Sequence, residues 1–246
     1  MKNIVLYFLV LIGFSQTLFA QNPNWTVRES DYQYTMTFVA KLNLDGKRLT
    51  GANDKVAAFV GNVCRGVSGV TYVASEKNYY AFLTVFANQQ GENISFRLYD
   101  ATANKTTNVS KQIPFNVNEH KGNLFQSYSI AEPALNNESE ILSFGFMNIT
   151  NLANIINSNE VKINISESYP LNNLKPIFTL SKGANLFKNK VLQKSGEITE
   201  SFLTAIHYEV LSEDESNLKS YTVNVSHTTD PTLFYRKNAV CYARGA

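Results

Sequence analysis

The feature that most constrains this chain is a strict alternation of side chains close to its start. Mostly apolar residues occupy every second position from Tyr32 to Leu44, and mostly polar residues stand between them. Successive side chains of a β-strand point to opposite faces, so a period of two over this stretch predicts a strand with one face on a core. The turn-forming dipeptide Asp45-Gly46 ends the pattern.

Similar patterns recur along the chain and predict a protein built almost entirely of strands. Val56 to Val60 is a continuous apolar run, as expected of a strand that is covered on both faces. One short stretch, from Leu152 to Ile156, is instead compatible with a single helical turn. Further strands are expected at residues 79–86, 94–98, 112–117, 125–130, 161–165, 178–180, 204–210 and 221–225, and another begins at Ile141.

A polar stretch with one proline and no apolar periodicity, residues 133–140, divides these strands into two sets. We therefore expect an all-β protein of two tandem β-sandwich-like modules after a cleaved signal peptide. The expected divisions are a signal peptide (1–20), a first module (21–132), a linker (133–140), a second module (141–228), and a tail or the start of a further element (229–246). We expect the chain to be a fragment of a longer protein.

The first twenty residues predict the compartment. Lys2 gives a basic start, residues 4–19 are uncharged and mostly apolar, and Ala20 precedes the polar Gln21. This order is typical of a secretory signal peptide. Since position 21 is not cysteine, a lipoprotein signal is not supported. The later chain has no apolar stretch long enough to span a bilayer, so we expect an exported protein on the cell surface, outside the cell or in the periplasm.

Composition excludes several classes of protein. The chain has 22 basic and 20 acidic side chains, which argues against a nucleic-acid partner held by net charge. A hydrophobic content of 44% is too high for intrinsic disorder. Two cysteines exclude a disulfide-dense scaffold and a multi-cysteine metal cluster. Whether Cys64 and Cys241 pair stays open, because a whole module separates them in the sequence.

No recognisable catalytic motif is present. The three histidines, at positions 120, 207 and 227, have no partner at metal-ligand spacing, and His207 is expected to face solvent. The segment Gly66-Val67-Ser68-Gly69 lacks one residue of the nucleophile-elbow pattern, and no glycine-rich phosphate loop occurs. We therefore expect no enzyme activity, no catalytic residue and no cofactor. A discontinuous carboxylate pair, as in glycosidases, remains an alternative.

Two acidic groups are weak candidates for a calcium site. Asp45, Asn53, Asp54 and Asp100 offer oxygen ligands near loops, and residues 213–215 form a second cluster. Neither group has the ordered spacing of a calcium loop, and solvated turns commonly have this composition. Calcium is therefore possible but only weakly indicated.

Aromatic residues and one arginine are the candidates for ligand contact. Trp25, Tyr32, Tyr72, Tyr79 and Tyr80 offer ring faces on which sugars can stack, although such rings are more often core or rim. Tyr32 is in phase with the apolar row and is expected in the core. Because Tyr79 and Tyr80 point to opposite faces, we expect one of them to be exposed. Arg65 is either an exposed contact residue or the solvated neighbour of a core cysteine.

A first resemblance covers residues 24–132. Its recognisable parts are Ala57-Ala58-Phe59-Val60-Gly61 followed by Cys64-Arg65-Gly66, and the strand Ile94-Ser95-Phe96-Arg97-Leu98-Tyr99-Asp100-Ala101. These segments resemble a β-rich module that recurs in secreted and surface proteins of Bacteroidota. The resemblance implies an architecture and a compartment, and only a generic role.

A second resemblance begins at Ile141 and includes Tyr208–Asp214 and Tyr221–Val225. This part is similar to immunoglobulin-like and cadherin-like bacterial surface domains, in which a Glu-Asp-Gly-Ser turn joins the last two strands. Glu215 stands where such families usually have glycine, so we expect a remodelled turn. The resemblance implies a spacer or an adhesive module.

Together these observations favour a non-catalytic, adhesin-like surface or secreted interaction module whose partner is a protein or glycan surface. The loops at the ends of a sandwich are where binding residues gather. Two alternatives remain open. One is a carbohydrate-binding module of a polysaccharide-degrading protein, and the other is a passive structural spacer.

Overall fold

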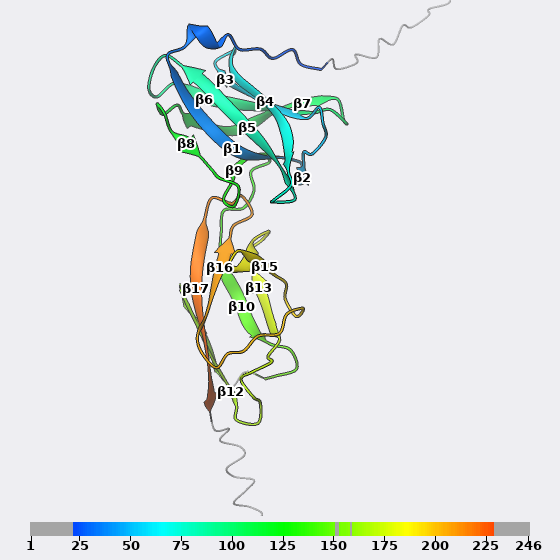
Figure 1. Cartoon of the computed structure of the whole chain (residues 1–246), viewed down its shortest axis with the longest axis vertical. Coiled ribbons are helices and arrows are strands. Elements are labelled where there is room, and N and C mark those ends of the chain that lie inside the picture. The colour runs from blue at the N-terminus through cyan, green and yellow to red at the C-terminus, as the bar shows by residue number, and fades with distance from the viewer. Residues whose placement is uncertain (1–21, 151–152, 158, 229–246) are drawn as a thin grey trace, which may run out of the picture.

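The computed structural model describes residues 22–150, 153–157 and 159–228. The expected signal peptide, the tail beyond residue 228 and Cys241 lie outside the described residues. Two bodies of strands lie end to end along the long axis of the molecule (Figure 1). We call them the first module, formed by β1 to β9, and the second module, formed by β10 to β17. The expectation of an all-β chain with a sandwich-like arrangement is confirmed.

The first module contains one nine-stranded sheet, preceded by a short 3-10 helix, Glu29–Asp31. The strands run in the order β2-β1-β5-β4-β3-β6-β7, and β8 and β9 also pair with β1, in parallel. Their bounds are β1 (Tyr34–Leu44), β2 (Lys47–Arg48), β3 (Lys55–Val60), β4 (Val63–Val73), β5 (Asn78–Ala87), β6 (Asn93–Asp100), β7 (Lys105–Pro114), β8 (His120–Lys121) and β9 (Tyr128–Glu132).

This sheet curls around a single core. The inward side chains of β1 and β5 share one buried cluster with those of β3, β6 and β7. Phe38 of β1 meets Phe96 of β6 at 5.8 Å between ring centroids, in an edge-to-face arrangement. The expected alternation is confirmed from Met36 to Leu44, since Met36, Phe38, Ala40, Leu42 and Leu44 are all buried. The start of the row is wrong: Tyr34 is 38% exposed, and Tyr32, expected in the core, precedes the strand and is only partly buried.

Strand β3 is covered on both faces, as its continuous apolar run predicts. Val56, Ala57, Ala58 and Phe59 are all buried. On the outer side, the ring of Trp25 meets Phe59 edge to face at 6.0 Å, and the guanidinium of Arg97 lies 4.0 Å from the centre of the same ring. The extended segment before the sheet therefore covers one face of the strand.

The close approach of β5 to β4 explains why the Cys64-Arg65-Gly66 segment ends in glycine. It lies buried in β4, where a Cβ atom would come within 2.1 Å of the carbonyl oxygen of Thr84 on β5. Backbone atoms cannot yield to such a contact, so only glycine fits. The local approach of two strands thus fixes this position.

The second module is a sandwich of two sheets. A two-stranded sheet, β10 and β13, faces a six-stranded sheet in the order β11-β12-β17-β16-β14-β15 (Figure 1). Strands β12 and β17 pair in parallel. The bounds are β10 (Ile141–Phe146), β11 (Ala153–Ile156), β12 (Glu160–Ser166), β13 (Pro176–Leu180), β14 (Asn185–Lys188), β15 (Val191–Gln193), β16 (Ile206–Leu211) and β17 (Leu218–Thr228).

Aromatic rings fill the space between these two sheets. Phe146 meets Phe202 at 5.0 Å, and Phe144 meets Tyr208 at 5.9 Å between ring centroids. Valine and isoleucine side chains of β12 complete the buried cluster. His207 is exposed, as its position between buried neighbours predicts.

The expected helical turn at Leu152 to Ile156 is wrong for the residues that the structure describes. Ala153–Ile156 is a strand that pairs antiparallel with Val161–Asn164. A short apolar run is compatible with either local structure, and here the free edge of β12 selects the strand. Within the described part of the chain, no helix is long and apolar enough to cross a membrane.

The segment between the modules has no strand but is held in place. The backbone N–H of Asn136 donates to Oε2 of Glu213 at 2.9 Å, and the N–H of Asp214 donates back to the carbonyl of Asn136 at 3.0 Å. The side-chain amide of Asn217 donates to the carbonyl of Asn137 at 2.7 Å. Residues 133–140 therefore lie hydrogen-bonded along the second module.

Candidate functional site

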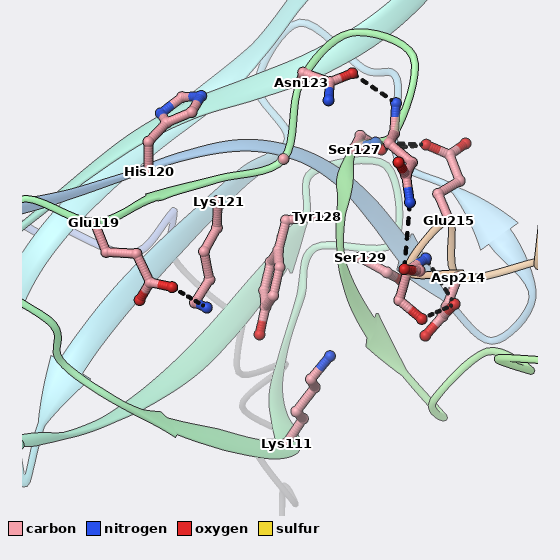
Figure 2. Close-up of a pocket in the computed structure, with 13 residues that line it drawn as sticks. Lys111, Glu119, His120, Lys121, Asn123, Ser127, Tyr128, Ser129, Asp214 and Glu215 are labelled. Atoms are coloured by element: carbon pink, nitrogen blue, oxygen red, sulfur yellow. Dashed lines mark hydrogen bonds and ion pairs between the residues drawn. The ribbon is translucent and has the colours of Figure 1, made fainter. Parts of the chain in front are cut away.

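A polar pocket of about 360 Å³ lies where the two modules meet. We call it the junction pocket; it is lined by Lys111, residues 119–123, residues 126–129 and residues 214–216. The first three of these groups belong to the first module, and the last belongs to the turn between β16 and β17. Figure 2 shows Lys111, Lys121 and Tyr128 on one side and Asp214 and Glu215 on the other.

The turn that carries Asp214 and Glu215 is shaped by a residue in a glycine-like conformation. Glu215 has φ of 59°, a left-handed conformation that glycine adopts most easily. Its carboxylate reaches across to the first module, where Lys41 donates to Oε1 at 2.5 Å. The N–H and hydroxyl of Ser127 donate to Oε2 at 3.0 Å and 2.5 Å. The carboxylate of Glu215 thus joins the two modules while its backbone keeps a glycine-like conformation.

This junction ion pair is largely shielded from solvent. The side chains of Lys41 and Glu215 are 11% and 15% exposed. Hydrogen bonds between charged groups are strong when water is excluded, and removing one partner leaves a buried charge unpaired. The contact therefore stabilises one arrangement of the modules over others.

Tyr80 and a pair of phenylalanines extend the contact between modules. Lys41 lies 5.2 Å from the centre of the Tyr80 ring, and burial, with the negative charge of Glu215, raises the pKa of Tyr80 to about 12. Nearby, Phe125 of the first module meets Phe187 of the second edge to face at 5.3 Å. Apolar and charged contacts together hold the walls of the junction pocket at a fixed separation.

Within the pocket, Glu119 and Lys121 neutralise each other. The Lys121 ammonium donates to Oε1 of Glu119 at 2.7 Å, and the side-chain amide of Asn116 donates to Oε2. Hydrogen bonds from Lys121 and then from Asn116 lower the pKa of Glu119, so it stays ionised near neutral pH. This pair contributes little net charge to the pocket.

Tyr128 forms part of the pocket wall beneath Lys111. The Lys111 ammonium lies 4.7 Å from the centre of its ring. The phenol oxygen is buried and has no hydrogen-bond partner among the residues that the structure describes. Burial raises the pKa of Tyr128 to about 12, so the phenol is neutral and retains its proton.

Of the predicted contact residues, the two tyrosines have different environments. Tyr80 is 2% exposed and donates from its hydroxyl to the carbonyl of Leu124 at 2.6 Å. Tyr79 is partly exposed and packs against Tyr72, with 5.1 Å between ring centroids. Tyr72 itself is 51% exposed. The exposed aromatic surface at the β4–β5 hairpin is therefore made by Tyr72 and Tyr79.

Arg65 is held by neighbours within the first module. Its guanidinium donates to Oε2 of Glu92 at 2.8 Å and lies 4.5 Å from the centre of the Tyr32 ring. Its side chain is only 14% exposed. The adjacent Cys64 is half-buried, its thiol lies 3.5 Å from the Gly66 carbonyl, and burial raises the pKa of that thiol. Both residues serve the packing of β4 in this structure.

The acidic candidates for calcium do not converge on a common point. Both carboxylate oxygens of Asp54 accept backbone hydrogen bonds, from Gly51 at 2.7 Å and from Ala101 at 2.9 Å. The carboxylates of Glu213, Asp214 and Glu215 each accept a hydrogen bond from a different residue. Among the described residues, no group of three or more His, Cys, Asp or Glu side chains is arranged to hold a metal ion.

An open groove of about 410 Å³ runs along the two-stranded sheet of the second module. Phe178, Ile177 and Gly145 contribute to it, and its rim carries the hydroxyls of Ser143 and Thr179. Several apolar side chains of this module are exposed, among them Ile177 at 41% and Leu142 at 62%. The second module therefore presents apolar surface to solvent.

The sequence did not reveal Lys111, Asp214 or Tyr128 as members of one site. Lys111 lies in β7, Tyr128 begins β9, and Asp214 lies in the last turn of the second module. Only the parallel pairing of β9 with β1 and the contact between modules bring them together. The one sequence feature that pointed to this site was Glu215, which stands where the related turns usually have glycine.

Comparison with known proteins gives one family match. Residues 141–225 match the family model described as "SGBP, N-terminal". This stretch covers almost the whole second module, and the match fits a surface module of the Bacteroidota. A search of curated proteins found no match.

Solved structures give weaker likenesses. A candidate glycoside hydrolase from Bacteroides thetaiotaomicron is 30% identical over 39% of this chain, with a TM-score of 0.34, and this chain covers only 26% of that protein. The titin domains Z1Z2, solved in complex with telethonin, align over 81% of this chain and 98% of theirs at 9% identity and a TM-score of 0.17. No conclusion on fold or function follows from scores this low.

Proposed function

We propose that this protein is a non-catalytic glycan-binding module of the Bacteroidota cell surface. The observation that carries the proposal is the family match, which spans residues 141–225 and concerns glycan-binding proteins without catalytic activity. It favours the carbohydrate-binding alternative over a general adhesive role. Export to the surface agrees with the apolar leader and small residue at the start of the chain.

The first module adds an aromatic surface suited to a sugar ring. Tyr72 exposes half of its side chain while Tyr79 packs against it and limits its movement. Aromatic rings bind the apolar face of a sugar and lose little conformational entropy because they have few rotatable bonds. We place one glycan contact at this ring pair.

A glycan array with the full chain tests the proposal. We expect binding to at least one polysaccharide class, weakened about tenfold, equivalent to about 1.4 kcal/mol, by Tyr72→Ala or Tyr79→Ala. Phe82→Ala is the matched control, because Phe82 is 48% exposed on the same strand as Tyr79 but points to the other face. If the wild-type protein binds no glycan on the array, the proposal is wrong.

Exposed apolar surface on the second module favours a second candidate, an adhesin-like contact with a protein. Leu142, Val191, Leu192 and Leu203 are each about half exposed or more. Exposed apolar patches often mark interaction surfaces. Adhesion to cells or matrix without binding to any glycan would favour this role. If the protein binds in neither assay, the passive structural spacer is the remaining interpretation.

A further inference from the structure

The junction pocket contains one cation and one anion that the protein itself does not neutralise. Glu119 is paired with Lys121, and Glu215 with Lys41. Among the residues that the structure describes, Lys111 and Asp214 form no ion pair within 4.0 Å. Figure 2 shows these two side chains on different walls of the pocket. The pocket thus offers a charged donor on one side and a charged acceptor on the other.

Asp214 has one oxygen committed to the fold and one available. Oδ1 accepts hydrogen bonds from the hydroxyl of Ser212 at 2.8 Å and from the N–H and hydroxyl of Ser216 at 3.0 Å and 2.7 Å. Oδ2 accepts none from the described residues. The carboxylate is therefore rigidly oriented, and its second oxygen can accept from a ligand without loss of an internal bond.

The opposite wall supplies donors. The Lys111 ammonium has three protons and rests over the Tyr128 ring, which orients it without accepting a strong hydrogen bond. Oδ1 of Asn123 accepts from the backbone N–H groups of Phe125 and Gln126 at 2.9 Å and 2.8 Å, which fixes the amide plane. Its NH₂ group is then a second donor at the pocket, since the amide oxygen is occupied.

We propose that the junction pocket binds a neutral sugar residue, with Lys111 donating to and Asp214 accepting from its hydroxyl groups. This inference rests on the proposed glycan-binding function and names a site for it. A sugar hydroxyl both donates and accepts, so it matches a pocket with a donor wall and an acceptor wall. A volume of about 360 Å³ lies at the small end of ligand pockets, which range over roughly 300–1,000 Å³, and suits a single sugar unit.

The charges of the pocket balance. Glu119 and Lys121 neutralise each other, and the unpaired Lys111 and Asp214 have opposite signs. A uronic acid carboxylate near Lys111 would also meet Asp214, and the ammonium of an amino sugar near Asp214 would also meet Lys111, so neither gains a net attraction. We therefore expect neutral sugars to bind at least as tightly as acidic or amino sugars.

The site exists only when both modules are held together. Lys111 belongs to the first module and Asp214 to the second, and Glu215, adjacent to Asp214, forms the contact that sets their separation. Glu215 is thus a positioning residue. The full chain is required for the experiment, because neither module alone contains the pocket.

The test uses ligand-observed NMR with the full chain and methyl glycosides of glucose, galactose and mannose. Each is compared with its uronic acid and its 2-amino analogue at neutral pH. We expect at least one neutral glycoside to bind, and its dissociation constant to rise at least tenfold in Lys111→Met and in Asp214→Asn. Asp214→Asn keeps one oxygen for Ser212 and Ser216, so the turn is retained.

Lys105→Met is the matched control, since Lys105 lies on the same strand, is 57% exposed and is not part of the pocket. The dissociation constant of the Lys105→Met variant for the neutral glycoside should stay within twofold of the wild-type value. Tighter binding of an acidic or amino analogue, unchanged binding in both pocket variants, or no binding of any neutral glycoside would overturn the inference. If Lys111→Met and Asp214→Asn both still bind the glycan array like the wild type, the pocket is not the sugar site but the proposed function stands. If the wild type binds nothing on the array, both the pocket and the proposed function are wrong.

Glu215→Gly separates positioning from direct contact. Glycine tolerates φ of 59°, so the turn is kept while the contact to Lys41 and Ser127 is lost. We expect the affinity for the neutral glycoside to fall, together with a larger radius of gyration by small-angle X-ray scattering. Glu215→Gln retains hydrogen bonding to Ser127 and should lose less affinity. Wild-type affinity in a Glu215→Gly protein with a larger radius would contradict the requirement for a closed junction.

Discussion

The two cores differ in their small side chains: the buried cluster of the first module mixes alanines with phenylalanines, whereas that of the second module contains no alanine among the described residues. In the first, the core cluster includes four fully buried alanines, Ala40, Ala58, Ala81 and Ala87, which let the strands of one sheet curl closely over the core. In the second, buried rings fill the space between two separate sheets: Phe144, Phe146, Phe202, Tyr208 and Tyr221. Small residues help one continuous sheet to curl, whereas in the second module buried rings pack between two sheets, which are also linked by hydrogen bonds from Ile141 to Tyr221 and from Asn154 to Phe144.

This difference predicts how each module responds to loss of a side chain. The core of the first module combines alanines and aliphatic side chains with Phe38, Phe96 and Phe115, so its stability is distributed over many positions. A core that depends on a few rings concentrates its stability in them, because the rings pack on one another, as Phe144 does on Phe202 and Tyr208. The single tryptophan, Trp25, lies against Phe59 in the first module, so its fluorescence reports unfolding of that module alone.

Phe146→Ala should have the largest effect. The ring is 1% exposed and touches both Phe144 and Phe202, so its removal leaves a cavity between the sheets and should cost about 3–5 kcal/mol. Unfolding followed by circular dichroism should show an early transition for the second module. The midpoint reported by Trp25 emission should move much less.

Leu83→Ala in the first module is the matched comparison. Leu83 is 1% exposed and lies against the backbone at Gly66, and its truncation should cost about 2–4 kcal/mol. Here the Trp25 transition should move first. If both variants shift the two signals equally, the modules unfold as one unit and the comparison between separate cores fails.

An intermediate effect is expected at the junction. Breaking the contact between Lys41 and Glu215 should cost about 1–3 kcal/mol, since a charged group remains in a shielded position. A double-mutant cycle of Lys41→Met and Glu215→Gln measures the coupling from the unfolding free energies. We expect the double variant to lose less than the sum of the single losses. Additive losses would show that the ion pair does not couple the modules.

The sequence predicted many of the strands, although it missed β4 (Val63–Val73), and it predicted their partners less well. The alternation of Met36 to Leu44 fixes both the strand and its buried face, because the pattern is local. Strand β11 was missed because residues 153–156 acquire their conformation from pairing with β12. The parallel pairing of β1 with β9 joins residues 40–44 to residues 128–132, and no local pattern encodes it.

The candidate site, too, could be predicted only where a local sequence pattern encodes it. Alternation predicted only that one of Tyr79 and Tyr80 would be exposed; Tyr79 is partly exposed, and Tyr80 is buried because its hydroxyl reaches the loop at Leu124. Lys111 and Asp214 are ordinary surface residues in the sequence. Their approach depends on Glu215, whose contacts are made with a different module.

The smallest effect concerns acid stability. Lys219 and then Tyr221 donate hydrogen bonds to Glu140, which lowers the pKa of that carboxyl group in the folded second module. Because the folded pKa lies below the unfolded value, the stabilisation is present above the unfolded pKa and is lost as pH falls through the folded pKa. Glu140 is 46% exposed, so solvent limits the effect to about 1 kcal/mol or less.

Glu140→Gln should therefore reduce stability at pH 7 and make little difference at pH 3, and only the transition of the second module should change. Glu119→Gln is the counterpart in the first module, because Lys121 and Asn116 lower the pKa of Glu119 in the same way. That variant should shift the Trp25 transition at pH 7 and leave the second module unchanged. An equal shift of both transitions by either variant would mean that the junction transmits these charges between modules, in which case the two cores are not independent units.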